Sequence, residues 1–279
     1  TLPEFGDVVF SDALNHASII DAIRLSRAKG LVFPHLDLDA LAAMLREKPC
    51  TGIRFVVVES IYSMDGDRAP LAALAAICRQ HGAVLIVDEA HAVGLFGTRG
   101  TGVIEADGLS HDGIVSVNTA GKALGVAGAF VAGPSDAIEY LVQRARPFVF
   151  STAPPPALAA AIDAALDVVA SEPERRERVG ALTAFLRRRL CDAGLPPMGG
   201  ESQIIPVRIG SNAQALAVAA RLHADGFDVR AIRPPSVPDG TARLRVPVNA
   251  LLDEETLDRF VRSLTAIWQE AGLCFAVSS

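Results

Sequence analysis

Three apolar runs, separated by helical patterns, constrain the fold of this chain most. The runs are RFVVVES at 54–60, AVLIVDEAH at 83–91 and GIVSVNT at 113–119. Continuous β-branched and aliphatic runs of this length are typical of strands buried on both faces of a parallel sheet. Shorter strands at 7–12 and 128–133 fit the same sheet, and the helices are expected at 17–28 (ending near Gly30), 36–48 (with Asp37 or Asp39 as N-cap) and 69–82. The alternation predicts an α/β fold with a mostly parallel sheet wrapped by helices.

The pattern changes in the last two fifths of the chain. A long charged helix is expected at 171–194, followed by strands at 203–209, 228–233 and 242–248 and helices at 213–226 and 253–272. That order is typical of an α+β unit. We therefore expect a large domain over residues 1–168 and a smaller C-terminal α+β domain over residues 169–279.

Composition excludes several classes of protein. Half of the residues are hydrophobic, which is enough for a sizeable core, and the net charge of −6 with no basic face argues against a nucleic-acid partner. The longest apolar runs are too short to span a membrane. The four cysteines (Cys50, Cys78, Cys191 and Cys274) show no metal-ligand spacing, so we favour free thiols in the reducing cytoplasm over disulfides, and no metal site.

Polar clusters follow each of the three buried runs. They are ESIYSMDGD at 59–67, VDEAHAVG at 87–94 and NTAGK at 118–122. Ligands of open α/β sheets bind at the carboxyl ends of the strands, so these clusters predict a site at that edge.

Asp88 and His91 admit more than one interpretation. They are three residues apart where a strand ends and could face one site, or they could be a turn cap and an ordinary loop residue. VDEAH also occurs in the Walker B strand of DEAH-type NTPases. That interpretation requires an upstream GxxxxGK[ST] loop, whereas the only Gly-Lys pair here is 121–122, downstream and followed by alanine.

Lys122 is one of three lysines in a chain with 26 basic residues, and small side chains surround it. It could be an ordinary surface lysine. However, it follows a buried strand, so we expect its amine to be partly desolvated and available for Schiff-base chemistry. Thr119, three residues earlier, could donate its hydroxyl to a phosphate or merely cap the turn. Together with Asp88 and His91, these residues indicate pyridoxal 5′-phosphate (PLP), which needs a lysine, a carboxylate at its ring nitrogen and hydrogen-bond donors.

At this point the chain resembles the α-oxoamine synthase family of fold-type I PLP enzymes. The blocks that carry the resemblance, in order, are 11–28, 59–71, 87–103, 118–129 and 150–156. The resemblance implies the PLP-transferase fold and a homodimer with a shared active site. It also implies that the family's N-terminal segment, with a glycine-rich loop that contacts phosphate, precedes the first residue of this chain.

The resemblance assigns roles to the cofactor site. Lys122 forms the Schiff base and moves the Cα proton of the bound amino acid. Asp88 pairs with the pyridinium, and His91 with Ser63 hydrogen-bonds the phenolic oxygen. His16 stacks on the ring, although a histidine in NHAS could simply start a helix, and Ser63 could simply belong to a turn. The phosphate-binding candidates are Thr119 and, across the dimer interface, Ser151 or Thr152.

The resemblance also assigns the substrate site. Arg245 is the first choice for the amino-acid carboxylate, with Arg233 and Ser236 nearby. Arg243 and Arg245 lie on one expected strand, and we expect only one of them to face the site. The segment 231–246 is most similar to the family member that joins L-alanine to pimeloyl-CoA, or to its carrier-protein thioester, in biotin biosynthesis. Relatives that condense glycine or serine with another acyl-CoA, and a non-catalytic partner subunit, remain alternatives.

Overall fold

The computed structural model describes residues 1–272 and divides into two compact units. The first unit comprises Thr1–Tyr62 and Ala69–Pro173, and the second comprises Ser63–Arg68 and Glu174–Ser279. The sequence placed the division after residue 168. It lies after Pro173, because helix α7 (Pro156–Ser171) continues past that point and α8 (Pro173–Asp192) starts only afterwards. No pattern in the sequence indicated that Ser63–Arg68 clusters with the C-terminal residues.

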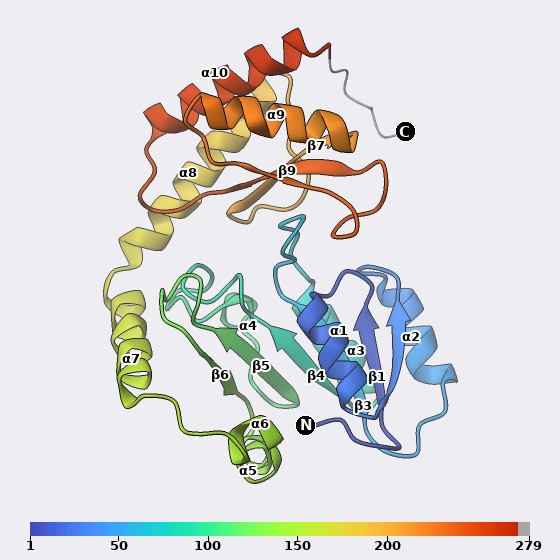
Figure 1. The fold of residues 1–279 in the computed structure, drawn as a ribbon. Coiled ribbons are helices and arrows are strands. Elements are labelled where there is room, and N and C mark those ends of the chain that lie inside the picture. Colours follow the sequence, from blue (N-terminus) through green and yellow to red (C-terminus); the bar gives the residue numbers. More distant parts are fainter. Residues whose placement is uncertain (273–279) are drawn as a thin grey trace. The chain divides into compact units, whose positions relative to one another are not determined.

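A six-stranded sheet forms the centre of the first unit, in the order β2-β1-β3-β4-β5-β6 (Figure 1). All neighbouring strands pair in parallel except β5 and β6, which are antiparallel. This confirms the mostly parallel sheet. The strands are β1 (Val8–Asp12), β2 (Lys29–Phe33), β3 (Arg54–Glu59), β4 (Ala83–Asp88), β5 (Ile114–Thr119) and β6 (Ala129–Ala132).

Helices cover both faces of this sheet. On one face, Val9 and Val57 pack with Ile19 and Ile23 of α1. Side chains of the opposite parity, such as Val56, are equally buried, as expected for a sheet sandwiched between helices. The helices of this unit are α1 (Ala17–Leu25), α2 (Leu38–Glu47), α3 (Leu71–Gln80), α4 (Val103–Ala106), α5 (Ser135–Arg144), α6 (Arg146–Val149) and α7.

Two parts of the first unit differ from the sequence-based expectation. The helix expected over 17–28 ends at Leu25, Arg27 takes a left-handed φ of 63°, and β2 starts at Lys29. β2 was missed because it is an edge strand with mostly exposed side chains, so its hydrophobic pattern is weak. Helices α5 and α6 were also missed, because neither buries a residue.

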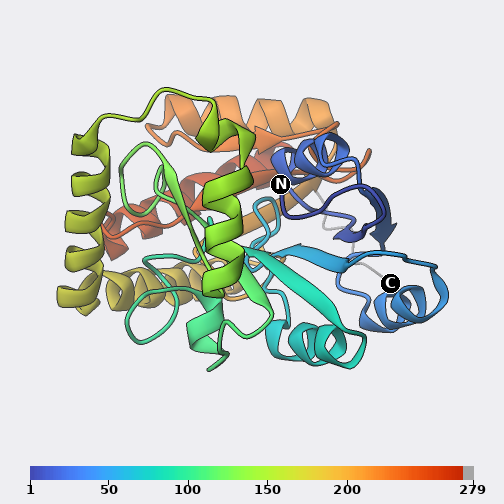
Figure 2. The same ribbon diagram turned by 90° about the horizontal axis from the view of Figure 1, so that it is seen from below.

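The second unit contains the α+β arrangement that the sequence indicated. Its antiparallel sheet has the strand order β7-β9-β8. Leucines of helices α8, α9 and α10 pack against one face of this sheet, where they meet Ile205, Val207 and Leu244. Figure 1 shows α9 and α10 side by side, and Figure 2 shows the same pair from below. The elements are β7 (Ile204–Gly210), α9 (Asn212–Ala224), β8 (Arg230–Ile232), β9 (Ala242–Pro247) and α10 (Glu254–Glu270).

None of the helices in the described part of the chain has the length and apolar character that a bilayer crossing requires. The described cysteines Cys50, Cys78 and Cys191 are free thiols, as expected. Burial raises the pKa of the Cys78 thiol to about 12, so it is an inert core residue. Cys274 lies outside the described residues.

Glu89 anchors the glycine-rich loop that follows β4. Its carboxylate is buried and accepts hydrogen bonds from Ser60 Oγ at 2.6 Å, from the backbone N–H of Val103 at 3.1 Å and from that of Ile104 at 2.8 Å. Burial raises the pKa of this carboxyl, and the three donors only partly offset that effect. Gly102 passes so close that a Cβ there would lie 2.7 Å from the Glu89 carboxylate.

This packing predicts a large cost for Gly102→Ala. Gly102 has φ +130° and ψ −169°, a region open almost only to glycine, and the new methyl group would also displace Glu89. We expect the free energy of unfolding in urea to fall by about 2–4 kcal/mol.

Gly108→Ala is the matched control, because Gly108 also has a left-handed φ of +64° but has open space at its Cβ position. This variant should lose about 1 kcal/mol in its free energy of unfolding. Equal losses of unfolding free energy in the two variants would show that the contact with Glu89 contributes nothing to the cost of Gly102→Ala.

Candidate functional site

The carboxyl ends of β1, β3, β4 and β5 lie along one edge of the first sheet (Figure 1). In the register, Glu59 pairs with Asp88, and Asp88 pairs with Val117, two residues before the end of β5. The loop that carries His16 leaves the end of β1, and the loop that carries Lys122 leaves the end of β5. The topology therefore brings Asp88 and the starts of the loops that carry His16 and Lys122 to one edge.

Asp88 is the electrostatic centre of this edge. One of its carboxylate oxygens accepts a hydrogen bond from the N–H of Ala90 at 2.8 Å. Burial raises the pKa of Asp88, while the Ala90 bond and the positive charges of Lys122 and His16 draw it back down. The structure thus brings Lys122 and His16 each within electrostatic reach of Asp88. A partly compensated carboxylate of this kind suits a cationic ring nitrogen.

Thr119 ends β5 with its side-chain hydroxyl directed into the protein. Its Oγ1 is buried and has no hydrogen-bond partner within the described part of the chain. A buried hydroxyl normally finds a partner, because leaving it unpaired costs free energy. The orphaned hydroxyl therefore fits a ligand oxygen, such as one of a phosphate group.

The turn that carries Lys122 is closed by backbone hydrogen bonds. Ala120 N–H donates to the Gly128 carbonyl at 2.9 Å, and Gly125 N–H donates to the Lys122 carbonyl at 3.1 Å. A Cβ added at Gly121 or Gly125 would meet nothing within 4 Å, so there is open space on both sides of the lysine. The expectation that Lys122 is partly desolvated is wrong for this chain by itself, because the residue is exposed.

His16 occupies the N-cap of α1, so it does start a helix. Its Nδ1 accepts a hydrogen bond from the Ser18 N–H at 3.2 Å and lies 2.8 Å from Ser18 Oγ. Its influence on Asp88 shows that the same residue also belongs to the charged cluster. The two interpretations of NHAS are therefore compatible.

The other predicted cofactor residues are more scattered. His91 is half-buried in the turn after β4. Ser151 and Thr152 are exposed after α6, where the Ser151 hydroxyl donates to the Pro147 carbonyl. Ser63 is buried in the second unit.

The second unit holds Ser63 next to Arg245, the first choice for the substrate carboxylate. Arg245 Nε donates to the Ser63 carbonyl at 2.7 Å, and burial lowers the pKa of Arg245. Arg233 and Ser236 form an exposed turn in which Ser236 N–H donates to the Arg233 carbonyl at 3.0 Å.

The expectation that only one of Arg243 and Arg245 faces the site is wrong in its reasoning. Residues two apart on a strand share a face, because side chains alternate with every residue. Arg243 is 4% exposed and pairs with Asp65, while Arg245 bonds Ser63, so both reach the segment Ser63–Arg68. The sequence contained a signal for this arrangement, because the DGD turn at 65–67 carries two acidic side chains, which favour basic partners.

Sequence reasoning also overlooked Glu89. It lies beside Asp88, and it holds the loop after β4 rather than contributing to the charged cluster. The signal was available in the adjacent acids of VDEAH, since neighbouring residues at a strand end point to opposite faces.

Comparisons with known proteins identify the family and the fold of this chain. Residues 3–264 match the model of aminotransferase class I and II. The 8-amino-7-oxononanoate synthase of Anaeromyxobacter dehalogenans (strain 2CP-1) is 51% identical over 262 residues, which cover 94% of this chain. The chain spans 65% of the length of that relative.

Two solved structures are similar to the chain. A high-resolution structure of SPT with PLP internal aldimine superposes on this chain with a TM-score of 0.92 at 32% sequence identity. The match covers 98% of this chain and 69% of the SPT chain. The 8-amino-7-oxononanoate synthase of Francisella tularensis gives a TM-score of 0.84 at 27% identity and covers 98% of this chain and 78% of its own. The fold-type I assignment is thereby confirmed, and the chain belongs to the aminotransferase class I and II family.

Proposed function

We propose that this chain forms most of a PLP-binding site and that the charged cluster of Asp88, Lys122 and His16 is its centre. The observation that carries the proposal is the pairing of this cluster with the orphaned Thr119 hydroxyl at the same sheet edge. When bound, PLP supplies an electrophilic carbonyl and a ring that withdraws electrons from a bound amino acid. The SPT relative carries PLP, which adds support.

Each residue of the chain has a defined task in this proposal. The Lys122 amine bonds the cofactor and carries the proton removed from the amino-acid Cα. Asp88 holds a proton on the ring nitrogen, because its buried carboxylate favours a nearby cation. His91 and Ser63 donate to the phenolic oxygen, and His16 stacks on the ring. Thr119 binds the phosphate.

We propose that the reaction joins L-alanine to pimeloyl-CoA, or to its carrier-protein thioester, and releases CO₂ and the free thiol of CoA or of the carrier protein to give 8-amino-7-oxononanoate. The 51% identity to a synthase of that name supports this choice. Arg245 would bind the alanine carboxylate through its guanidinium, with Arg233 and Ser236 near the substrate. The side chain of Arg243 is committed to Asp65, which favours Arg245 for this role.

A second candidate is the condensation of serine with an acyl-CoA. The TM-score of 0.92 to SPT favours it, whereas the identity of 32% is well below that of the synthase relative. The amino-acid test below separates the two.

The proposal includes a homodimer in the cytoplasm. Ser151 or Thr152 would contact the phosphate bound by the partner subunit, and their exposure leaves them available for it. The exposed Phe148 and Phe150 on the same segment offer apolar area for such an interface. The free thiols support a reducing compartment.

Lys122→Ala tests the covalent link. Borohydride treatment of the PLP-loaded protein should attach the cofactor to the peptide that contains Lys122, detected by mass spectrometry together with loss of the visible absorbance band. The variant should show neither, because alanine has no amine. Lys48→Ala, at the exposed C-cap of α2, should behave like the wild type. A labelled peptide that lacks Lys122 would refute the assignment.

Asp88→Asn tests the ring-nitrogen partner. The variant should still bind PLP but exchange the Cα proton of L-alanine at least about 100-fold more slowly, because a neutral amide cannot hold the ring nitrogen protonated. Exchange is followed in D₂O by NMR. Asp112→Asn, in an exposed loop, is the control. Unchanged exchange in Asp88→Asn would remove Asp88 from the site.

The choice of amino acid tests the reaction. L-alanine should perturb the visible band at lower concentration than glycine or L-serine, and CO₂ release should then require pimeloyl-CoA or its carrier-protein thioester. A response to L-serine and a long-chain acyl-CoA would establish the second candidate. A response to glycine alone would contradict both.

A further inference from the structure

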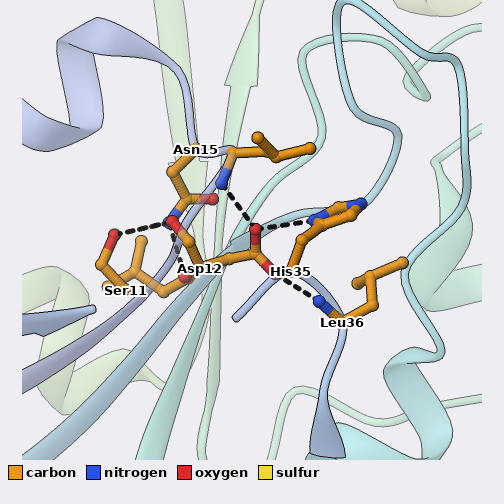
Figure 3. A network of polar contacts seen from close by, with 7 residues as sticks. Ser11, Asp12, Asn15, His35 and Leu36 are labelled. Carbon is orange, nitrogen blue, oxygen red and sulfur yellow. Dashed lines mark hydrogen bonds and ion pairs between the residues drawn. The ribbon is translucent and has the colours of Figure 1, made fainter. Parts of the chain in front are cut away.

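A buried carboxylate at the end of β1 has no place in the proposed reaction. Asp12 has a fully buried side chain, and three donors surround it. Oδ1 accepts from Leu14 N–H and from His35 Nδ1, each at 2.8 Å, and Oδ2 accepts from Leu36 N–H at 2.9 Å (Figure 3). The donors come from the β1–α1 loop and from the β2–α2 loop. Asp12 therefore ties together two loops that are far apart in the sequence.

The network continues through Asn15, the residue before His16. Asn15 Nδ2 donates to Ser11 Oγ at 2.9 Å and to the Val57 carbonyl at 2.7 Å, and Asn15 N–H donates to the Asp12 carbonyl at 3.2 Å. Figure 3 shows His35 and Leu36 bonded to the Asp12 carboxylate, with the Asn15 side chain bonded to Ser11 beside them. The backbone that leads to His16 is thus fixed at successive positions.

The second loop also adopts a costly conformation at this network. Leu36 has a left-handed φ of 52°, which is uncommon for a leucine and persists only where the surroundings enforce it. The His35 ring packs edge-on against Tyr62 with a centroid distance of 4.5 Å, which fixes the imidazole that donates to Asp12. Burial alone would raise the pKa of Asp12, but the bonds from His35, Leu36 and Leu14 outweigh it and hold the pKa below its ordinary value.

We infer that Asp12, with His35, is a positioning residue that sets the His16 imidazole in the cofactor site. The role of His16 in the cofactor site comes from the proposed function, and the inference rests on the proposed function only in that respect. The Leu14 bond and the Asn15 anchors fix the loop, and the contact of Nδ1 with Ser18 then fixes the orientation of the ring. Asp12 touches neither the amino acid nor the acyl donor in this scheme.

The test compares Asp12→Asn with Asp7→Asn. Asp7 is a matched control, because it lies just before the opposite end of β1, is 9% exposed and accepts backbone bonds from Glu4 at 2.8 Å and Ile53 at 2.7 Å. An asparagine at either position keeps the size of the side chain but cannot accept all of these bonds, so both variants should lose stability in urea.

Two measurements separate positioning from stability. Nitrogen NMR of histidine-labelled protein without PLP should give the same His16 ring signals in the wild type and in Asp7→Asn. In Asp12→Asn the His16 signals should shift or broaden, because the ring is no longer held in one orientation. The PLP dissociation constant should rise about tenfold in Asp12→Asn, in line with partners that orient a ligand histidine, and less than twofold in Asp7→Asn.

His35→Phe is the second variant, in case Asp12→Asn fails to fold. Phenylalanine keeps the ring contact with Tyr62 but removes the donor to Asp12, so the same changes are expected with a rise of about threefold in the dissociation constant. His16 signals that match the wild type in all folded variants would overturn the inference. The NMR measurement needs no cofactor, so a failure of the wild type to bind PLP would contradict the proposed function and leave this inference open to the same test.

Discussion

The parallel pairing of β1, β3, β4 and β5 is the constraint on which the candidate site depends. These strands are buried on both faces, so their charged side chains gather where the strands end. The register then aligns the ends, because Glu59 pairs with Asp88 and Ser11 with Val57. Loops that are far apart in the sequence consequently start from one edge, and Lys122 can influence Asp88 without being its neighbour in the chain.

Asp12, Asp88 and Glu89 at this edge differ in how they are satisfied, and the difference indicates their roles. Asp12 and Glu89 each accept hydrogen bonds from three donors. They are structural anchors that hold loops. Asp88 accepts one hydrogen bond from Ala90 and otherwise depends on the charges of Lys122 and His16. A carboxylate with so few fixed donors has capacity for a cationic ligand, so the donor inventory separates a binding group from its supports.

The parts of the molecule that could be predicted from the sequence are those in which buried apolar residues form a regular pattern along the chain. The runs at 54–60, 83–91 and 113–119 became β3, β4 and β5, because continuous apolar runs have few alternatives to a buried strand. Edge strand β2 was invisible to this reasoning, since its exposed side chains carry no such pattern. Individual site residues could be selected by type and spacing, but their partners could not. The Asp12–His35 bond joins the end of β1 to the loop between β2 and α2, and only the folded sheet brings these residues together.

The segment Ser63–Arg68 shows why the local sequence pattern was least informative about where the chain divides into two units. It follows Tyr62 directly, yet its tertiary partners are Arg243, Arg245 and Ser202. Because Arg245 Nε is bound to the Ser63 carbonyl, the group proposed for the substrate carboxylate and the residue proposed for the cofactor share one hydrogen bond. A change in the position of one must therefore be felt by the other. The chain passes between the two units at 62–63, 68–69 and 173–174, so the segment Ser63–Arg68 is joined covalently to the first unit at both of its ends.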